Sequence, residues 1–257
     1  MKVMRCFSTL ALAMLAVSSL PAQTPQSNPP TISQLEFQKP KMGMTQQYED
    51  GRKQKAAWHK QQNDRLPLLV WEIISGDDTN TYIVGQPPQH WADFDKPSIP
   101  EEQDLAEYNK VIGNYVESLK VRFYEYLPKI SNPPASQMPM KYEEVVVFRT
   151  RYGRYADFRS AISRINDAAK QTKWPVNYEW YQLANGGAGG EWVLILPHEN
   201  WAGFEDQPNV KPYRDMIKDA FGQEEADSIM NRIDSSVTSE SSSIIQFRPD
   251  LSYMPGK

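Results

Sequence analysis

The chain repeats itself at an offset of about 110 residues, and this repetition restricts its fold more than any other feature. A pattern of Trp, Ala, any residue, Phe and an acid occupies residues 91–95 and recurs at residues 201–205. Gly43 and Gly153 are separated by the same 110 residues. Landmarks that recur in the same order indicate a repeated structural unit.

Further matches support the repeat and fix its limits. Trp71 aligns with Trp180 at an offset of 109, and residues 127–131 match residues 248–252 near the two repeat ends. We therefore predict a tandem duplication. Its parts are a first repeat at 34–131, a proline-rich linker at 132–140, a second repeat at 141–252 and a tail at 253–257.

Each repeat is expected to contain the order β-α-β-β-α-β, the ferredoxin-like unit. The apolar stripe Phe158, Ile162, Ile165 and Ala169 predicts an amphipathic helix, and the glycine-rich residues 185–190 are expected to form a hairpin turn. In the first repeat the expected elements are residues 34–41, 45–64, 68–75, 81–86, 101–119 and 121–127. In the second they are residues 143–150, 155–173, 176–183, 191–196, 210–237 with a break near Gly222, and 242–248.

Both faces of residues 68–74 are largely apolar, so one face should meet helices and the other a second sheet. The chain thus resembles the dimeric α/β-barrel superfamily over residues 34–252, in the style of secreted bacterial proteins of unknown function. The resemblance implies an α+β fold in which two antiparallel sheets pair into a barrel, here as a pseudodimer within one chain. The superfamily includes small-molecule monooxygenases and haem-binding or haem-degrading members, but none of their diagnostic motifs is intact here.

The N-terminal residues have the order of a secretory signal peptide. Lys2 and Arg5 precede an uncharged, mostly apolar run that ends at Leu20. We predict a signal peptide at residues 1–22 and a flexible leader at 23–33, with an uncleaved anchor as the alternative. Cleavage removes Cys6, the one cysteine, and leaves 26 basic and 32 acidic residues, a net charge of −6. A periplasmic or extracellular location is expected.

Composition excludes several classes of protein. The whole chain has a net charge of −4, so it offers no basic field for nucleic acid. Its mean hydropathy of −0.64 is too low for several membrane spans, and we expect none in the mature chain. A single cysteine excludes a multi-cysteine metal site, and no common hydrolase, metalloprotease or dinucleotide-binding motif is present. No metal site is predicted.

One helix face carries the candidate site. At the 110-residue offset, the apolar stripe of the second repeat corresponds to Tyr48, Arg52, Lys55 and His59 in the first. Polar groups on a sheet-facing stripe need a partner or water. We therefore predict a polar ligand pocket between helix and sheet, lined by Arg52, Lys55, His59, Glu72 and, from the second repeat, Glu179. The alternative is a rotated helix that leaves these side chains in solvent.

The remaining candidates have simpler interpretations. We expect the recurring tryptophans to pack in the core, with Trp91 and Trp201 fixing the segment after each hairpin. His90 and His198 are expected in turns, and the doublet Glu143-Glu144 at a solvated position.

Three functions remain open at this point. The first is non-catalytic binding of a small, partly apolar ligand between helix and sheet, including an anionic molecule. The second is a cofactor-independent monooxygenase or a haem-related enzyme, in which His59 would be the axial ligand. The third is a structural or partner-binding protein whose barrel is filled by aromatic side chains. A monomer is favoured, and the ligand, any cofactor and any catalysis stay open.

Overall fold

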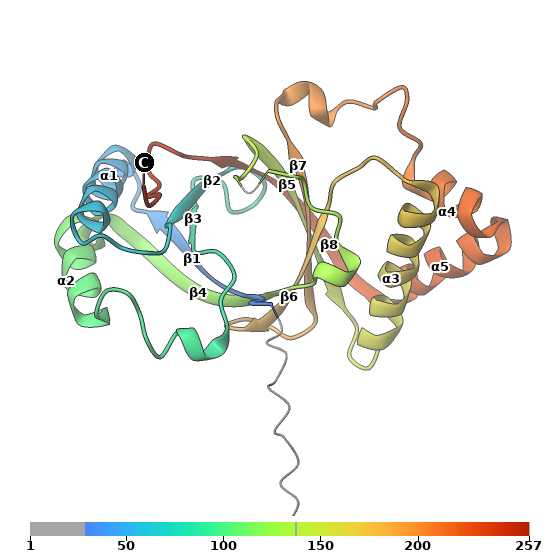
Figure 1. Cartoon of the computed structure of the whole chain (residues 1–257), viewed down its shortest axis with the longest axis horizontal. Helices are drawn as coiled ribbons and strands as arrows, with labels where there is room; N and C mark the ends of the chain where they lie inside the picture. The colour runs from blue at the N-terminus through green and yellow to red at the C-terminus, as the bar shows by residue number, and fades with distance from the viewer. Residues whose placement is uncertain (1–28, 137, 257) are drawn as a thin grey trace, which may run out of the picture.

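A computed structural model of the chain describes residues 29–136 and 138–256, which fold into strands and helices in two successive halves (Figure 1). The first half contains β1 (Ile32–Pro40), α1 (Thr45–Gln61), β2 (Leu69–Ser75), β3 (Tyr82–Gly85), α2 (Glu101–Val111) and β4 (Val116–Tyr126). The second half contains β5 (Tyr142–Thr150), α3 (Tyr155–Thr172), β6 (Glu179–Asn185), β7 (Glu191–His198), α4 (Tyr213–Phe221), α5 (Gln223–Ser236) and β8 (Val237–Phe247). Short 3-10 turns are η1 (Trp91–Asp93), η2 (Gly113–Tyr115), η3 (Pro128–Ile130) and η4 (Trp201–Phe204).

The strands close into one antiparallel barrel in the order β1-β3-β2-β8-β5-β7-β6-β4. Two seams join the halves, β2 with β8 and β4 with β6. Helices α1 and α2 lie against one side of the barrel, and α3, α4 and α5 lie against the other (Figure 1). The predicted α+β class and the predicted joining of antiparallel sheets into a barrel are therefore confirmed.

Several element boundaries differ from the prediction. The helix expected at 101–119 ends at Val111, and β4 begins at Val116 after a 3-10 turn at Gly113. Residues 117–121 of β4 are exposed to solvent and mix apolar with polar side chains, so the sequence does not mark where the helix ends and the strand begins. β1 begins at Ile32, inside the segment expected to be the leader. The predicted signal peptide lies outside the described residues, and none of the helices within them is long and apolar enough to cross a membrane.

The break predicted near Gly222 is present, and it separates α4 from α5. Gly222 has a φ of 84°, a left-handed conformation that favours glycine. The hairpin turn predicted at residues 185–190 also forms, because β6 and β7 pair as antiparallel neighbours on either side of it. The glycine-rich segment is therefore a connection between strands.

The predicted equivalence of Trp71 and Trp180 is wrong by one residue. Trp71 lies opposite Ile83 in the pairing of β2 with β3, and Tyr181 lies opposite Val193 in the pairing of β6 with β7. An offset of 110 therefore matches Trp71 to Tyr181. A shift of one residue turns a strand side chain to the other face. Accordingly, Trp71 lines the barrel interior, whereas Trp180 packs under the helices of the second half.

The other tryptophans follow the expectation only in part. Trp192 is buried in the core of the second half. Trp91 and Trp201 are 52% and 54% exposed, although each packs against a phenylalanine of its own segment. Core packing is therefore wrong for this pair, and their contacts with Phe94 and Phe204 fit the expected local anchoring.

Each half sends its C-terminal segment onto the other half. The Oγ atom of Ser131 accepts a hydrogen bond from the backbone N–H of Trp180, and the Oγ atom of Ser252 accepts one from that of Val70, both at 2.9 Å. Leu251 is fully buried in the core of the first half. In Figure 1 the C-terminus accordingly lies next to α1, across the barrel from α5. The last residues of the chain thus complete the first half.

The interior of the barrel is hollow. Side chains from all eight strands line a cavity of about 550 Å³, among them the aromatic residues Phe37, Trp71, Tyr124 and Tyr181. The alternative of a barrel filled by its aromatic side chains is therefore wrong. Outside the barrel, the second half has a large apolar core between α3 and the sheet, whereas α1 buries Arg52, Lys55 and His59 at the corresponding positions.

Gly51 allows α1 to approach the end of α2, and this approach generates a prediction. A Cβ atom at Gly51 would lie 2.1 Å from the carbonyl oxygen of Val111. We expect Gly51→Ala to lower the free energy of unfolding by about 2 kcal/mol or more, because the clash involves backbone. Alanine would otherwise strengthen a helix by about 1 kcal/mol. Denaturant unfolding measures the change.

Ala57→Gly is the matched control, because Ala57 is exposed on the same helix. It should cost about 1 kcal/mol, the ordinary difference in helix propensity. An unchanged or higher stability of Gly51→Ala would contradict the close contact between α1 and α2.

Candidate functional site

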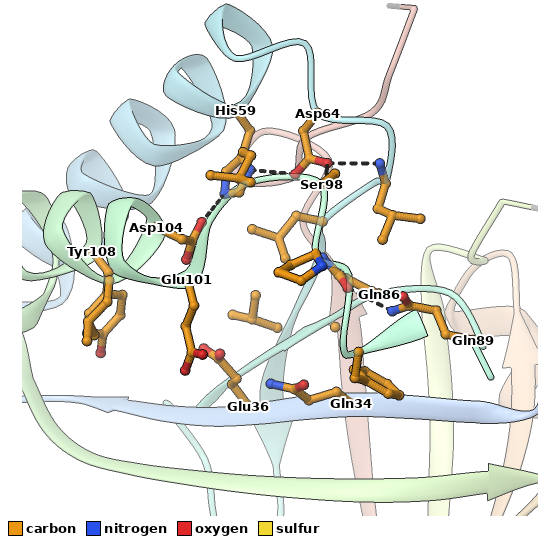
Figure 2. A pocket seen from close by; sticks show the side chains of 18 of the residues that line it. Gln34, Glu36, His59, Asp64, Gln86, Gln89, Ser98, Glu101, Asp104 and Tyr108 are labelled. Carbon is orange, nitrogen blue, oxygen red and sulfur yellow. Dashed lines mark hydrogen bonds and ion pairs between the residues drawn. The ribbon is translucent and has the colours of Figure 1, made fainter. Parts of the chain in front are cut away.

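A cavity of about 430 Å³ lies between the helices of the first half and the outer face of its sheet. Figure 2 shows α1 and α2 above it and β1 below it, with the connection between β3 and α2 at one side. Apolar side chains form much of its wall, namely Leu66, Leu68, Val84, Phe94, Ile99, Leu105, Leu119 and Phe123. Polar groups of α1, α2 and β1 project into it. We call this cavity the helix–sheet pocket.

His59 and Asp64 form a buried pair at the upper end of the helix–sheet pocket. The Nδ1 atom of His59 lies 2.8 Å from Oδ2 of Asp64, and both side chains are nearly inaccessible to solvent. The other oxygen of Asp64 accepts hydrogen bonds from the Ser98 hydroxyl and from the backbone N–H of Leu66. With Asp64 held in this way, the imidazole has a fixed orientation (Figure 2).

The C-terminal segment supports the same pair from behind. Tyr253 donates a hydrogen bond from its hydroxyl to the backbone carbonyl of Asp64 at 2.7 Å. Its ring stacks on His59 with the ring centroids 5.8 Å apart. The orientation of His59 therefore depends on residues almost 200 positions away in the chain.

Asp104 of α2 faces both His59 and Lys55. Its Oδ1 atom lies 3.4 Å from Nε2 of His59 and 2.9 Å from the ammonium nitrogen of Lys55. Lys55 also donates to the backbone carbonyl of Asp104 at 2.7 Å and sits over the Trp58 ring. The ammonium group of Lys55 is thus paired within the protein, where it links α1 to α2.

Burial favours the neutral form of both basic groups. It lowers the pKa of His59, against the opposing effect of its hydrogen bond to Asp64. Burial also lowers the pKa of Lys55, and the hydrogen bond to Asp104 opposes this change. A neutral imidazole that donates from Nδ1 to Asp64 has an unprotonated Nε2, and this buried atom faces Oδ1 of Asp104. His59 is therefore arranged to accept a proton.

Arg52 differs from Lys55 and His59 because it forms no ion pair with another of the described residues. The side chain is 2% exposed, yet its Nε and Nη2 atoms have no hydrogen-bond partner within the described part of the chain. Arg52 lines the helix–sheet pocket one turn before Lys55. A guanidinium stays charged at every physiological pH, and burying it without a partner is costly.

The floor of the helix–sheet pocket carries acceptors of hydrogen bonds. The hydroxyl of Tyr48 donates to Gln38, and the amide of Gln38 donates to Glu36, at 2.9 and 2.6 Å. Figure 2 shows the Glu101 side chain reaching from α2 toward Glu36 on β1. A ligand that places a negative group near Arg52 therefore also lies near the carboxylates of Glu36 and Glu101. Hydroxyl or N–H groups on that ligand could donate hydrogen bonds to them.

The structure brings together three of the five residues predicted for the ligand pocket. Arg52, Lys55 and His59 are buried on the sheet-facing side of α1 and line one cavity. The alternative of a rotated helix, with these side chains in solvent, is therefore wrong. Whether the cavity binds a ligand stays a prediction at this point.

Glu72 and Glu179 lie elsewhere. Glu72 accepts a hydrogen bond from Arg248, which also pairs with Glu49, so the C-terminal segment supplies the partner of Glu72. Glu179 points into the barrel. Its neighbour Trp180 points toward the helices, because successive side chains of a strand lie on opposite faces. Neither carboxylate lines the helix–sheet pocket.

The partners of the basic stripe carry almost no signal of their own in the sequence. Asp64, Ser98 and Asp104 come from two loops and a second helix, and none is repeated in the second half. The one available signal was Asp104 in the first turn of an expected helix, where an acidic residue is common for reasons of the helix dipole alone.

The arrangement does not fit haem with His59 as its axial ligand. Asp104 occupies the space in front of Nε2, at 3.4 Å, and is held there by Lys55. An iron atom would need that nitrogen at about 2 Å, the usual length of a metal–imidazole bond. His90 and His198 do not line the helix–sheet pocket. The described residues also contain no group of three or more His, Cys, Asp or Glu side chains placed to hold a metal ion.

Comparison with known proteins identifies the type of fold. No protein-family model and no curated protein sequence matches the chain. A protein of Lactobacillus acidophilus NCFM, provisionally assigned as a monooxygenase, superposes with a TM-score of 0.53 at 8% identity, over 88% of this chain and 97% of its own. An anthrone oxidase-like protein gives 0.51 at 12% identity, over 88% and 94%.

A third solved structure agrees with these two. A variant of chlorite dismutase from Candidatus Nitrospira defluvii gives a TM-score of 0.50 at 10% identity, over 87% of this chain and 93% of its own. Identities this low carry the fold alone. The neighbours are of the dimeric α/β-barrel type, as the sequence resemblance predicted.

The environment of His59 predicts its titration. We expect the pKa of His59 to lie below 6.5 because burial disfavours the imidazolium, and Asp64→Asn should lower this pKa further by removing the carboxylate that opposes burial. The unfolded chain then takes up this proton first, so the free energy of unfolding falls as the pH drops below 6.5. NMR titration of the imidazole signals measures both effects.

The control is His198, which lies in the other half and whose pKa should be the same with and without Asp64→Asn. With 3 histidines in the chain, single substitutions assign the signals. A rise in the pKa of His59 in Asp64→Asn would contradict the pairing.

Proposed function

We propose that this protein binds a small, partly apolar organic anion in the helix–sheet pocket. The observation that carries the proposal is Arg52, a guanidinium 2% exposed that lines the cavity with two nitrogen atoms unpaired. An anionic group of the ligand would supply the missing partner through charge-assisted hydrogen bonds. The apolar wall of the pocket would cover the rest of the molecule.

The positions of the polar groups restrict the ligand further. Arg52 and His59 are seven residues apart on α1, which corresponds to about 10 Å along the helix axis. A ligand that contacts both has the length of two or three fused rings. Glu36 and Glu101 at the floor favour hydroxyl or N–H groups on the same molecule.

The His59–Asp64 pair supports a second candidate, a cofactor-independent oxygenase. In this candidate Asp104 moves away from Nε2 of His59, so that this nitrogen accepts a proton from a carbon acid, and Arg52 stabilises the resulting oxyanion. A neutral, oriented imidazole with a carboxylate behind it suits the role of a base. The similarity in fold to an anthrone oxidase-like protein suggests which substrate to test. The haem-related alternative receives no support from the geometry at His59.

We also propose that the two halves arose by duplication and that the mature protein is exported as a monomer. Equivalent strand pairs at an offset of 110, such as Phe37 with Ile83 and Val147 with Val193, support the duplication. Both barrel seams form within one chain, so no second subunit is needed to close the sheet. Export rests on the sequence of residues 1–22.

The role of Arg52 can be tested with a matched pair of probes, 2-naphthoate and its neutral analogue 2-naphthamide. We expect the anion to bind at least about 10-fold more tightly, an advantage of about 1.4 kcal/mol from a charged hydrogen bond. Arg52→Gln should abolish this preference, and Arg52→Lys should keep only part of it because lysine lacks the planar fork. Isothermal titration calorimetry measures the affinities.

Lys53→Gln is the control, since Lys53 is exposed on the same helix and its loss removes the same charge. Arg52→Met should not lower the melting temperature, because it removes a buried charge that has no partner. Equal binding of the two probes, or a preference that survives in Arg52→Gln, would sink the proposal.

The second candidate predicts proton transfer from anthrone. We expect the protein to accelerate deuterium exchange at the anthrone methylene in D2O by about 100-fold or more, the usual range for a positioned base. His59→Gln should return the rate to that of the solution reaction, while His198→Gln should leave it unchanged. NMR follows the loss of the methylene signal. Exchange that is not accelerated, or that survives in His59→Gln, would exclude His59 as the base.

A further inference from the structure

A second cavity, the barrel lumen, lies on the other face of the same sheet. It has a volume of about 550 Å³ and is lined by the inward-facing residues of all eight strands. Its wall is mainly apolar and includes Leu35, Phe37, Leu69, Trp71, Ile73, Ile83, Val145, Val147, Val193, Ile195 and Ile245. The size and the wall suit a small apolar molecule.

The charged groups in the lumen are nearly all acidic. Asp77, Asp78, Glu143, Glu179 and Glu191 line it, and Arg122 is the one basic side chain among the lining residues. Arg122 is already paired, since it lies 3.0 Å from Glu191. Glu191 also receives Arg149 and the hydroxyl of Tyr124, so this carboxylate is fully satisfied.

Glu143 and Glu179 have no such partner. No Lys, Arg or His side chain of the described residues forms an ion pair with either carboxylate. Glu143 is 8% exposed and projects into the lumen from β5, with the indole of Trp71 as its polar neighbour. Glu179 accepts a hydrogen bond from the hydroxyl of Tyr181 at 2.8 Å. Two carboxyl groups therefore share an apolar chamber in which no cation from the described part of the chain is paired with either of them.

Burial makes these carboxyl groups hold a proton more strongly as long as no cation is paired with them. Burial, together with the charge of Glu179, raises the pKa of Glu143 to about 8, and burial also raises the pKa of Glu179. Tyr181 stays protonated beside them, because burial raises its pKa as well. A positively charged group entering the lumen would favour the ionised carboxylates and release the proton.

We propose that the barrel lumen binds an apolar organic cation, of the class of primary arylalkylamines, with its ammonium group between Glu143 and Glu179. The apolar wall covers the ring, and the ammonium group donates hydrogen bonds to the carboxylates. This site is separate from the helix–sheet pocket and takes a ligand of the opposite charge.

The test uses three probes that share one ring and differ in charge, namely 2-phenylethylamine, 2-phenylethanol and 3-phenylpropionate. We expect the amine to bind at least about 10-fold more tightly than the alcohol, and the propionate not to bind in the lumen. Calorimetry at pH 7 in buffers of different ionisation enthalpy should detect close to one proton released per amine bound. The affinity for the amine should rise between pH 6 and pH 8 as Glu143 loses its proton.

Glu143→Gln is the decisive variant. Glutamine resembles the protonated acid in shape, so the fold should be retained, while affinity for the amine should fall at least about 10-fold and proton release should disappear. Glu144→Gln is the matched control, because Glu144 is the next residue on β5 and does not line the lumen. It should bind the amine as the unmodified protein does.

The outcomes separate this site from the helix–sheet pocket. Arg52→Gln should leave amine binding unchanged, and Glu143→Gln should leave naphthoate binding unchanged. Tight binding of the alcohol, binding without proton release, or amine binding that survives in Glu143→Gln would overturn the proposal for the lumen and leave that for the helix–sheet pocket intact.

Discussion

Barrel closure is the constraint on which the rest of the structure depends. The seams of β2 with β8 and of β4 with β6 satisfy backbone groups that would otherwise lie at open sheet edges. Closure also places the C-terminal segment against the first half, where Leu251 completes the core and Tyr253 supports Asp64. The orientation of His59 is therefore a consequence of closure, although His59 itself lies outside the barrel.

The two halves differ in what lies between their helices and the sheet. Beneath its helices the second half has a continuous apolar core, with Phe158 and Ile162 on the helix face that carries Arg52 and Lys55 in the first half. Burying an unpaired guanidinium destabilises a fold whose net stability is only about 5–15 kcal/mol. Because the seams join both halves into one sheet, the well-packed half can compensate for the polar pocket in the other.

The sequence predicted correctly the features that depend on a single residue type or on the spacing of residues along one helix. The stripe of Arg52, Lys55 and His59 followed from helical spacing alone, and the break at Gly222 from the residue type. The partners of the stripe could not be predicted, because Asp64, Ser98 and Asp104 reach it through tertiary contacts. Glu143 was expected in solvent and lies in the barrel lumen, since strand periodicity does not tell which face is enclosed.

Strand register links the two cavities. On β1, Leu35 and Phe37 face the barrel lumen while Gln34 and Glu36 face the helix–sheet pocket. Because side chains alternate at every residue, a slip of one position would exchange these two sets. The same rule explains why Trp71 and Trp180 lie on opposite faces despite their apparent match in sequence. Gly85 of β3 lies opposite Leu35 of β1, and the Leu35 side chain occupies the space that a Cβ atom at this position would take. The alternation of side chains along the strands thus separates the two cavities. The barrel lumen, with its carboxyl groups in an apolar wall, lies on one face of the sheet, and the helix–sheet pocket with Arg52 lies on the other.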